Sequence, residues 1–254
     1  MLYKNLIEFL RIRIAFYISM ITLFGYLLYN SIGQSWVIIT IASFFAGIAG
    51  YSHNNFFDYE EDKVNKRKTL KSKYLILVPY CFFFAGLLMI VNHHTHSIVF
   101  YSAPVILSWA YSSLRLKKIL FLKNLYTSLG IVLIFLFGAT FELLNKEVLV
   151  GACFVFFTIL AAAICSDIRD LKGDKKAGVK TLPVVLGVEK TKVIIISLLS
   201  LALLTSLILF YPASFFILLM IILVIYNKFK TAHNVSGVMF LILNLLLILL
   251  NTLQ

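Results

Sequence analysis

The sequence predicts an all-α membrane protein, a bundle of about nine transmembrane helices, and three observations support this fold class. Hydrophobic residues make up 61% of the 254 residues and charged residues only 13%, whereas soluble domains are roughly half apolar and a quarter charged. Apolar stretches of about 20 residues, the length that crosses a bilayer as a helix, recur along the chain. Lysine and arginine are concentrated in one set of loops, as in multi-pass membrane proteins.

Nine stretches are predicted to cross the membrane as helices, because a helix satisfies its own backbone hydrogen bonds in lipid. They cover residues 14–32, 36–57, 74–91, 97–114, 125–144, 148–166, 193–211, 213–226 and 235–253. The seventh and eighth stretches form one apolar run that is too long for a single span. Pro212 ends a helix within this run, so we expect the chain to turn there and cross twice. The alternative is eight spans or fewer.

Basic residues predict the orientation of these spans. All but one of the 23 lysines and arginines lie in the N-terminal segment, in three loops, or between the last two spans; the exception is Lys146. The three loops are residues 58–73, 115–123 and 167–192. Because cytoplasmic loops are enriched in Lys and Arg, we expect the N-terminus and these loops in the cytoplasm and the C-terminus outside. This asymmetry accounts for the net charge of +12 without a nucleic-acid partner.

The composition also excludes several classes of protein. A chain this apolar is not a disordered segment or an ordinary cytosolic enzyme. Cys81, Cys153 and Cys165 all fall within apolar runs, so the sequence does not suggest a secreted disulfide scaffold. We expect residues 1–254 to form a single integral-membrane domain.

Seven of the eleven acidic residues lie in two clusters, each directly after a predicted span. The first cluster is Asp58, Glu60, Glu61 and Asp62, and the second is Asp167, Asp170 and Asp174. Asn54, Asp58 and Asp62 are four residues apart, and the second set is spaced by three and four, so each set would share one helical face. Oxygen ligands grouped in this way suit Mg²⁺, which bridges carboxylates to phosphate oxygens. Two such faces opposite each other could hold a diphosphate between metal ions.

The alternative is that these acids are only solvated. They would then pair with neighbouring basic residues: Lys63, Arg169, Lys172, Lys175 and Lys176. Two clusters at matching depths, with Asn54 still inside an apolar run, favour a functional role, because polar groups at membrane depth are costly.

Three segments resemble the UbiA superfamily of intramembrane prenyltransferases. Residues 54–70, NNFFDYEEDKVNKRKTL, resemble the family's first motif, and residues 166–187, SDIRDLKGDKKAGVKTLPVVLG, resemble its second. Residues 111–124, YSSLRLKKILFLKN, resemble the segment between them. The order and spacing match over nearly the whole chain, and nine helices is the family's fold.

The resemblance implies Mg²⁺-dependent transfer of a prenyl group from a prenyl diphosphate to a lipophilic, aromatic or glycerophosphate acceptor, in a cavity that faces the cytoplasm. Carried over residue by residue, the implied metal ligands are Asn54, Asp58, Asp62, Asp167, Asp170 and Asp174. Arg115 and Lys117 would bind the diphosphate, and the ring of Tyr111 would face the ionising C1 carbon. A phenol ring can stabilise a cation there through its negative face.

Two positions depart from the family pattern. Asn55 replaces the usual Asp after the first Asn, which removes one carboxylate. The family's Pro-x-Arg-Pro after the first motif is absent, so the diphosphate-binding base there is Arg67 or Lys68.

Two other functions remain open from the sequence. An intramembrane terpene cyclase would ionise the same diphosphate without a separate acceptor. A cation transporter would use the acidic clusters as its pathway, but it predicts acids near the middle of the bilayer, whereas these lie at one face. Among acceptors, the GVKTLPVVLG stretch looks more like the branches that handle glycerophosphate ethers or quinone and chlorophyll precursors than like the haem branch.

Overall fold

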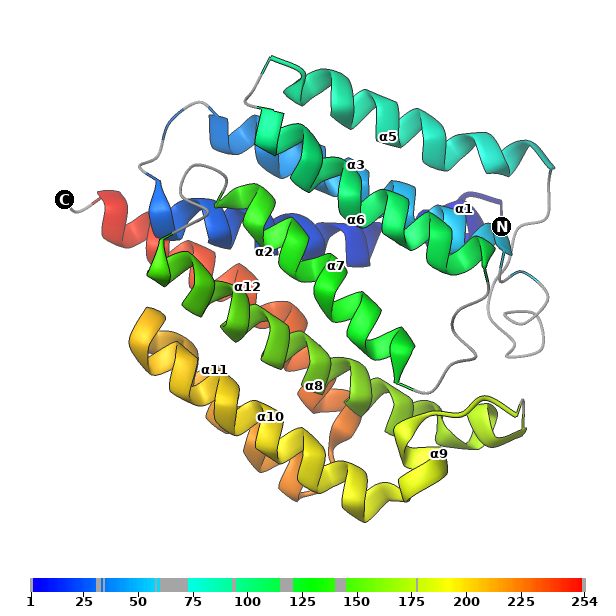
Figure 1. The fold of residues 1–254 in the computed structure, drawn as a ribbon, viewed down its shortest axis with the longest axis vertical. Coiled ribbons are helices and arrows are strands. Elements are labelled where there is room, and N and C mark those ends of the chain that lie inside the picture. The colour runs from blue at the N-terminus through cyan, green and yellow to red at the C-terminus, as the bar shows by residue number, and fades with distance from the viewer. Residues whose placement is uncertain are drawn as a thin grey trace. The chain divides into compact units, whose positions relative to one another are not determined.

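The structure is a computed structural model, and it describes residues 2–30, 33, 35–57, 59, 73–92, 95–114, 121–139, 145–176 and 178–252. Throughout these residues the regular elements are helices (Figure 1). The chain divides into two compact units, Met1–Arg115 with Leu133–Thr140, and Leu116–Val132 with Phe141–Gln254. The assignment of residues 1–254 to one domain stays a prediction.

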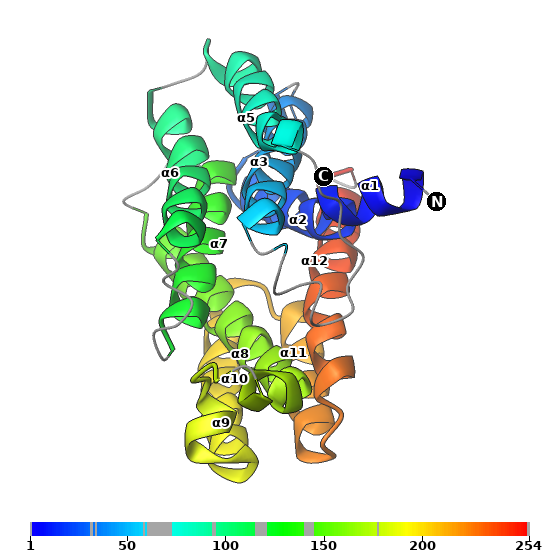
Figure 2. The ribbon, with the colours of Figure 1, turned by 90° about the vertical axis from the view of Figure 1, so that its right-hand side faces the viewer.

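The first unit is built around one long central helix. Its elements are α1 (Leu2–Leu10), α2 (Ile12–Tyr29), α3 (Ser35–Phe57), η1 (Lys73–Ile76), α5 (Leu77–Ile90), α6 (Thr95–Ser113) and the last residues of α7 (Leu122–Gly138). α3 packs against α2, α5 and α6 (Figures 1 and 2). Tyr101 of α6 is fully buried, and its hydroxyl donates a hydrogen bond of 2.9 Å to the carbonyl oxygen of Phe83 in α5.

Small residues allow α2 and the end of α7 to approach closely. A Cβ added at Gly138 would collide with the carbonyl oxygen of Thr22. The Thr22 hydroxyl lies 3.3 Å from the carbonyl oxygen of Ile134, to which it donates. Small residues at helix crossings are typical of membrane bundles, where packing rather than the hydrophobic effect holds helices together.

The second unit contains the first residues of α7 and the five helices that follow. These are α8 (Lys146–Lys176), α9 (Leu182–Leu186), α10 (Val188–Leu209), α11 (Pro212–Ile225) and α12 (Phe229–Thr252). α8 packs against both α10 and α12, and α11 contacts α10 and α12 (Figure 2). The rings of Phe154 in α8 and Phe240 in α12 meet edge to face, with centroids 6.2 Å apart.

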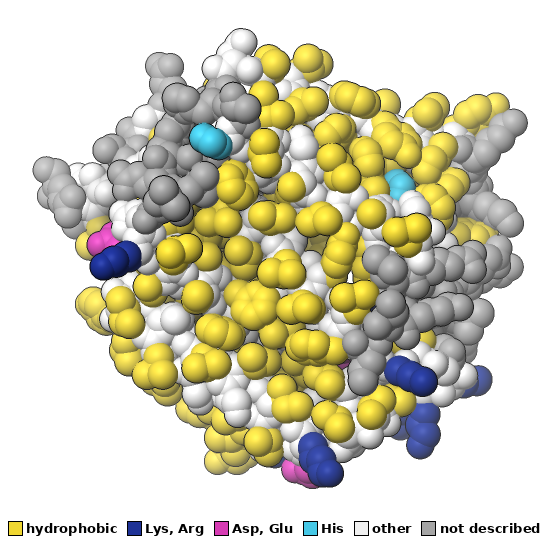
Figure 3. Space-filling view, in the orientation of Figure 1, with side chains coloured by type: hydrophobic (Ala, Val, Ile, Leu, Met, Phe, Trp, Pro, Cys, Tyr) yellow, Lys and Arg dark blue, Asp and Glu magenta, His cyan; other side chains and the backbone are white. Residues whose placement is uncertain are grey.

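The all-α membrane architecture is confirmed. Five described helices are long and apolar enough to cross a membrane, within Leu6–Tyr29, Ser35–Phe57, Lys146–Lys176, Val188–Leu209 and Phe229–Thr252. Shorter apolar helices cover Tyr74–Ile90, Leu122–Gly138 and Pro212–Ile225. Hydrophobic side chains cover most of the face shown in Figure 3, with charged side chains near its margins. The count of nine spans stays a prediction.

The turn at Pro212 is also confirmed. α10 ends at Leu209 and α11 begins at Pro212. Proline at the first position of a helix loses no hydrogen bond, because that N–H has no partner within the helix. The apolar run from residue 193 to residue 226 is therefore two helices.

Candidate functional site

The second acidic motif lies on a continuation of α8 beyond its apolar part. α8 has 31 residues, so it is about 46 Å long, whereas the hydrocarbon core is about 30 Å thick. The helix ends at Lys176, and Gly178 then adopts a positive φ of 70°. The Val179 N–H donates back to the carbonyl oxygen of Asp174 at 2.9 Å. The motif is therefore held on one regular helix, with Asp167, Asp170 and Asp174 near one face as their spacing predicts.

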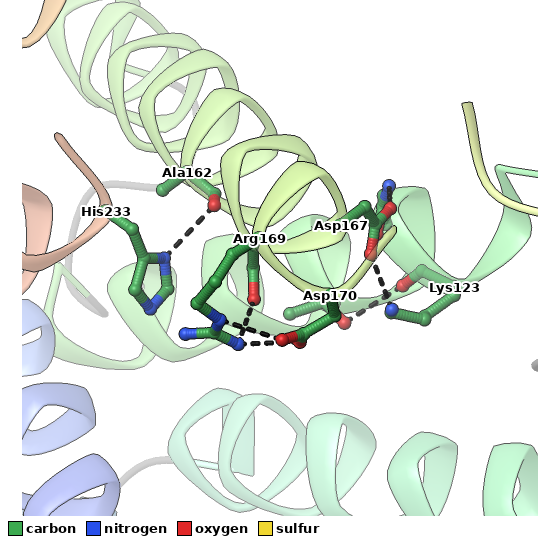
Figure 4. Close-up of polar contacts among 9 residues, drawn as sticks. Lys123, Ala162, Asp167, Arg169, Asp170 and His233 are labelled. Carbon is green, nitrogen blue, oxygen red and sulfur yellow. Dashed lines mark hydrogen bonds and ion pairs between the residues drawn. The ribbon is translucent and has the colours of Figure 1, made fainter. Parts of the chain in front are cut away.

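Asp167 is the most buried acid of this motif, with 1% of its side chain exposed. Lys123 Nζ lies 2.6 Å from its Oδ1, and Asn124 Nδ2 donates to its Oδ2 at 2.6 Å (Figure 4). Both partners come from the first turn of α7. A buried carboxylate needs such partners, because an unpaired charge away from water is costly. Each oxygen of Asp167 therefore already has a strong donor.

Asp170 lies closer to solvent and pairs with its neighbour. Arg169 donates to its two oxygens at 2.9 and 2.7 Å and to the hydroxyl of Ser166 at 2.8 Å (Figure 4). About a third of each charged side chain in this pair is exposed. Exposed ion pairs contribute about 0–1 kcal/mol, so this contact would yield readily to a divalent cation. The alternative that these acids are only solvated also predicts a pair between Asp170 and Arg169.

Asp174 has a buried oxygen available for a ligand. Its Oδ2 is buried, and the carboxyl interacts with the Thr181 hydroxyl and with the charges of Lys123, Asp167 and Asp170. A buried carboxylate oxygen among other acids fits a hard cation such as Mg²⁺. Within the described part of the chain, no group of three His, Cys, Asp or Glu side chains could hold a metal ion. The acids described here would thus supply only part of a metal site.

The end of α3 carries the described part of the first motif. Asn54 Oδ1 accepts a hydrogen bond of 2.9 Å from the hydroxyl of Ser112, so the motif lies beside the α6 segment that contains Tyr111. Asn55 turns elsewhere: its Nδ2 donates to the carbonyl oxygen of Phe9 at 2.8 Å. The first motif and the 111–124 segment therefore meet at Asn54.

Six predicted site residues lie outside the described residues. They are Asp58, Asp62, Arg67, Lys68, Arg115 and Lys117. Their roles stay predictions.

Three contacts of the site were not expected from the sequence. Lys123 and Asn124 belong to the quoted 111–124 segment, but their pairing with Asp167 joins residues 44 and 43 positions apart. Ser112, also in that segment, is the partner of Asn54. The segment's resemblance to a family motif was the one signal that could have pointed to these residues.

An aromatic group lies next to Asn54. His53 is 2% exposed and stacks on Trp109, with ring centroids 5.4 Å apart. The ring centroid of Phe57 lies 4.7 Å from that of His53. Tyr80 of α5 meets Trp109 edge to face at 4.7 Å. His53 is thus buried among aromatic rings directly beside Asn54.

Comparison with known proteins gives a consistent result. The family model "UbiA prenyltransferase family" matches residues 18–238. The digeranylgeranylglyceryl phosphate synthase of Methanosphaera stadtmanae is 28% identical over 222 residues, 79% of this chain and 78% of that relative. The enzyme of the same name from Methanobrevibacter smithii is 30% identical over 188 residues, 68% of this chain and 65% of the relative. A third, from Pyrococcus horikoshii, is 27% identical over 169 residues, and the chain spans 60% of its length.

Solved structures show the same fold. A UbiA homologue from Archaeoglobus fulgidus bound to GPP and Mg²⁺ superposes with a TM-score of 0.75 at 17% identity, covering 96% of this chain and 99% of that one. An apo UbiA homologue from Aeropyrum pernix K1 gives 0.74 at 15% identity, covering 94% and 98%.

Proposed function

This chain belongs to the UbiA prenyltransferase family, and on that premise we propose that it joins a prenyl chain to a glycerophosphate acceptor within the membrane. The enzyme is a prenyltransferase with several membrane-spanning helices. Relatives named digeranylgeranylglyceryl phosphate synthase support a prenylated glyceryl phosphate as the acceptor. The GPP and Mg²⁺ bound to the Archaeoglobus homologue support a prenyl diphosphate donor and Mg²⁺.

The proposed reaction breaks one bond and forms another. The bond between prenyl C1 and the diphosphate oxygen breaks, and its electron pair leaves with the diphosphate. C1 then bonds to a hydroxyl oxygen of the glycerol, which loses its proton. The slow part is the loss of a highly charged leaving group in a medium of low dielectric constant, so the residues of the site must offset that charge.

The residues proposed to hold Mg²⁺ come from both motifs. They are Asn54, Asp58 and Asp62 of the first motif and Asp167, Asp170 and Asp174 of the second. When bound, Mg²⁺ supplies positive charge to the departing diphosphate. Arg115, Lys117 and either Arg67 or Lys68 are proposed to grip the diphosphate oxygens, where arginine binds in a bidentate manner and lysine acts as a point charge. The ring of Tyr111 is proposed to face C1.

The observation that carries this proposal is the state of Asp174. It lies one helical turn after Asp170, on a helix that has left its apolar part, and one of its oxygens is buried close to Thr181 and two other acids. A purely solvated acid would present both oxygens to water. An oxygen held dry beside two other carboxylates is what a cation-binding acid requires.

The test is product analysis with purified protein in detergent. Radiolabelled geranylgeranyl diphosphate and geranylgeranylglyceryl phosphate, with Mg²⁺, should give a labelled ether lipid and free diphosphate. Excess EDTA should abolish turnover, and added Mg²⁺ should restore it. A cyclised hydrocarbon formed without acceptor would instead identify a terpene cyclase. Full turnover in EDTA would refute the metal requirement, and ion flux in liposomes without any turnover would identify a transporter.

We also propose a cytoplasmic N-terminus and an external C-terminus, from the distribution of basic residues. The exposed thiols of Cys81 and Cys153 would first be replaced by serine, and Lys66→Cys then introduced. A membrane-impermeant thiol reagent should label this cysteine only after cells are opened. Labelling in intact cells would reverse the topology.

A further inference from the structure

We infer that Lys123 is a further diphosphate-binding residue and that Asp167 is the positioning residue that holds it, rather than a ligand of the metal. This inference rests on the proposed function and concerns the same site. It reassigns one of the three acids of the second motif, and it gives a role to a lysine that motif comparison left without one.

The first step is the bonding of Asp167. Its carboxylate is buried, and its two oxygens receive hydrogen bonds of 2.6 Å each from Lys123 and Asn124. To bind a metal ion, Asp167 would have to accept a second cation beside the ammonium that already touches it. Like charges at such short distances repel strongly, and more so away from water. The buried acid is therefore better suited to hold Lys123 than to hold Mg²⁺.

The second step is the asymmetry of the pair. The side chain of Asp167 is 1% exposed, whereas that of Lys123 is 41% exposed. An ammonium group has three N–H donors, and the described contact with Asp167 uses one. The buried Asp167 thus fixes the lysine, while much of the lysine side chain stays accessible to a ligand. A flexible side chain held in this way loses less freedom when it binds a ligand.

The third step is the position of the ammonium within the motif. Lys123 acts electrostatically on Asp174, as do Asp167 and Asp170, so its charge reaches the acid that carries the buried oxygen. Figure 4 shows Lys123 of α7 beside Asp167 of α8. Asp167 in turn lies one helical turn before Asp170 on α8. A diphosphate bound through Mg²⁺ at Asp170 and Asp174 would meet this ammonium, which can donate charge-assisted hydrogen bonds to phosphate oxygens.

The experiment measures binding rather than turnover. Isothermal titration with geranylgeranyl thiolodiphosphate, which keeps the diphosphate but does not ionise readily, would be carried out in detergent with Mg²⁺. Lys123→Met should weaken binding by about tenfold or more, the scale of losing a hydrogen bond to a charged group, and Lys123→Arg should recover most of it. Lys172→Met, which removes an exposed lysine of α8, is the matched control and should bind like wild type.

A double variant separates this role from a purely structural one. If Lys123 only neutralises Asp167, then Lys123→Met with Asp167→Asn should regain wild-type affinity, because the buried charge has gone with its partner. We expect instead that the double variant binds as weakly as Lys123→Met alone. Restored affinity would overturn the inference. If Lys123→Met does not fold, Lys123→Gln, which keeps a donor for Asp167 without the charge, takes its place in both variants.

The Mg²⁺ dependence tests the reassignment of Asp167. Asp167→Asn keeps an acceptor for Lys123, so the Mg²⁺ concentration that gives half-maximal binding should change by less than about threefold, well below the roughly 10- to 100-fold that is typical even for residues that support metal ligands. A rise of tenfold or more would place Asp167 in the metal site and overturn the inference. Failure of the wild-type protein to bind the analogue at all would overturn the proposed function, and this inference with it.

Discussion

Arg11 donates two hydrogen bonds to the side-chain oxygen of Asn55, from Nε at 3.3 Å and from Nη2 at 3.2 Å. Arg11 lies between α1 and α2 with a φ of 50°, and the Asn55 amide donates to the carbonyl oxygen of Phe9 in α1. Asn55 therefore ties the end of α3 to the junction of α1 and α2. Where the family pattern has a carboxylate, this protein has Asn55, and its amide makes a structural contact with Arg11 and Phe9. Asn54 has a different partner, Ser112 of α6.

Replacing Asn55 tests this structural role. Asn55→Leu removes the amide that accepts from Arg11 and donates to the Phe9 carbonyl, and it should lower the free energy of unfolding by about 1 kcal/mol, the typical net contribution of a hydrogen bond. Denaturant unfolding in mixed micelles, followed by circular dichroism, would measure the loss. Asn55→Asp keeps the acceptor for Arg11 and loses only the donor, so it should cost less. It should leave the Mg²⁺ requirement of turnover unchanged; a lower requirement would place residue 55 among the metal ligands.

The crossing of α2 and α7 gives a prediction with a control on the same helix. Gly138→Ala would push a methyl group into the carbonyl oxygen of Thr22, and overpacking of this kind costs about 1–3 kcal/mol. Gly130→Ala, also in α7, meets no atom within 4 Å. It should be neutral or stabilising by up to about 1 kcal/mol, because alanine favours helix over glycine. Unfolding measured in parallel on both variants would test the crossing, and equal stabilities would contradict it.

Much of the fold could be predicted from the sequence because lipid imposes a simple rule. Long apolar runs must be helices, and proline marks where one helix begins, as at Pro212. The motif on α8 could be located in the same way, but not the extension of that helix to Lys176. The αL conformation at Arg11 was also missed, because arginine gives no local signal for it.

The contacts within the site were harder to predict. Lys123 is one of four basic residues in the loop at 115–123, and periodicity does not tell which of them turns inward. Its partner is 44 residues away, so only the packing of α7 on α8 selects it. The family resemblance, now confirmed, located the segment but gave this lysine no role.

The proposed role of Tyr111 depends on its ring rather than on its hydroxyl. Tyr111→Phe keeps the aromatic face and should retain most of kcat. Tyr111→Leu removes the attraction of a ring for an allylic cation, which is about 0.5–2 kcal/mol, and should lower kcat by roughly two- to thirtyfold. Initial rates at saturating Mg²⁺ and donor would measure this. Equal losses in the two variants would assign the effect to the hydroxyl and contradict the proposal.

The two acidic motifs should act as one catalytic unit, and this is the sharpest difference between a metal site and solvated acids. Asp58→Ala or Asp170→Ala removes one proposed ligand. Each should lower kcat by at least about 10²-fold, the scale of losing one electrostatic stabiliser of the transition state. The double variant should lose little more than the worse single variant, because residues that work as a unit are non-additive.

Solvated acids predict the opposite pattern for these variants. Asp170→Ala would remove an exposed contact with Arg169, a pair of the kind that contributes about 0–1 kcal/mol, so each alanine variant would be nearly as active as wild type and any small effects would add. Lys172→Ala, exposed on the same helix as Asp170, controls for changes in surface charge and should keep its activity. Near-normal kcat for both single aspartate variants, measured on folded protein at matched concentration and saturating Mg²⁺, would rule out the two-motif site, because a metal that offsets the charge of a departing diphosphate cannot lose a ligand from either motif without slowing that departure.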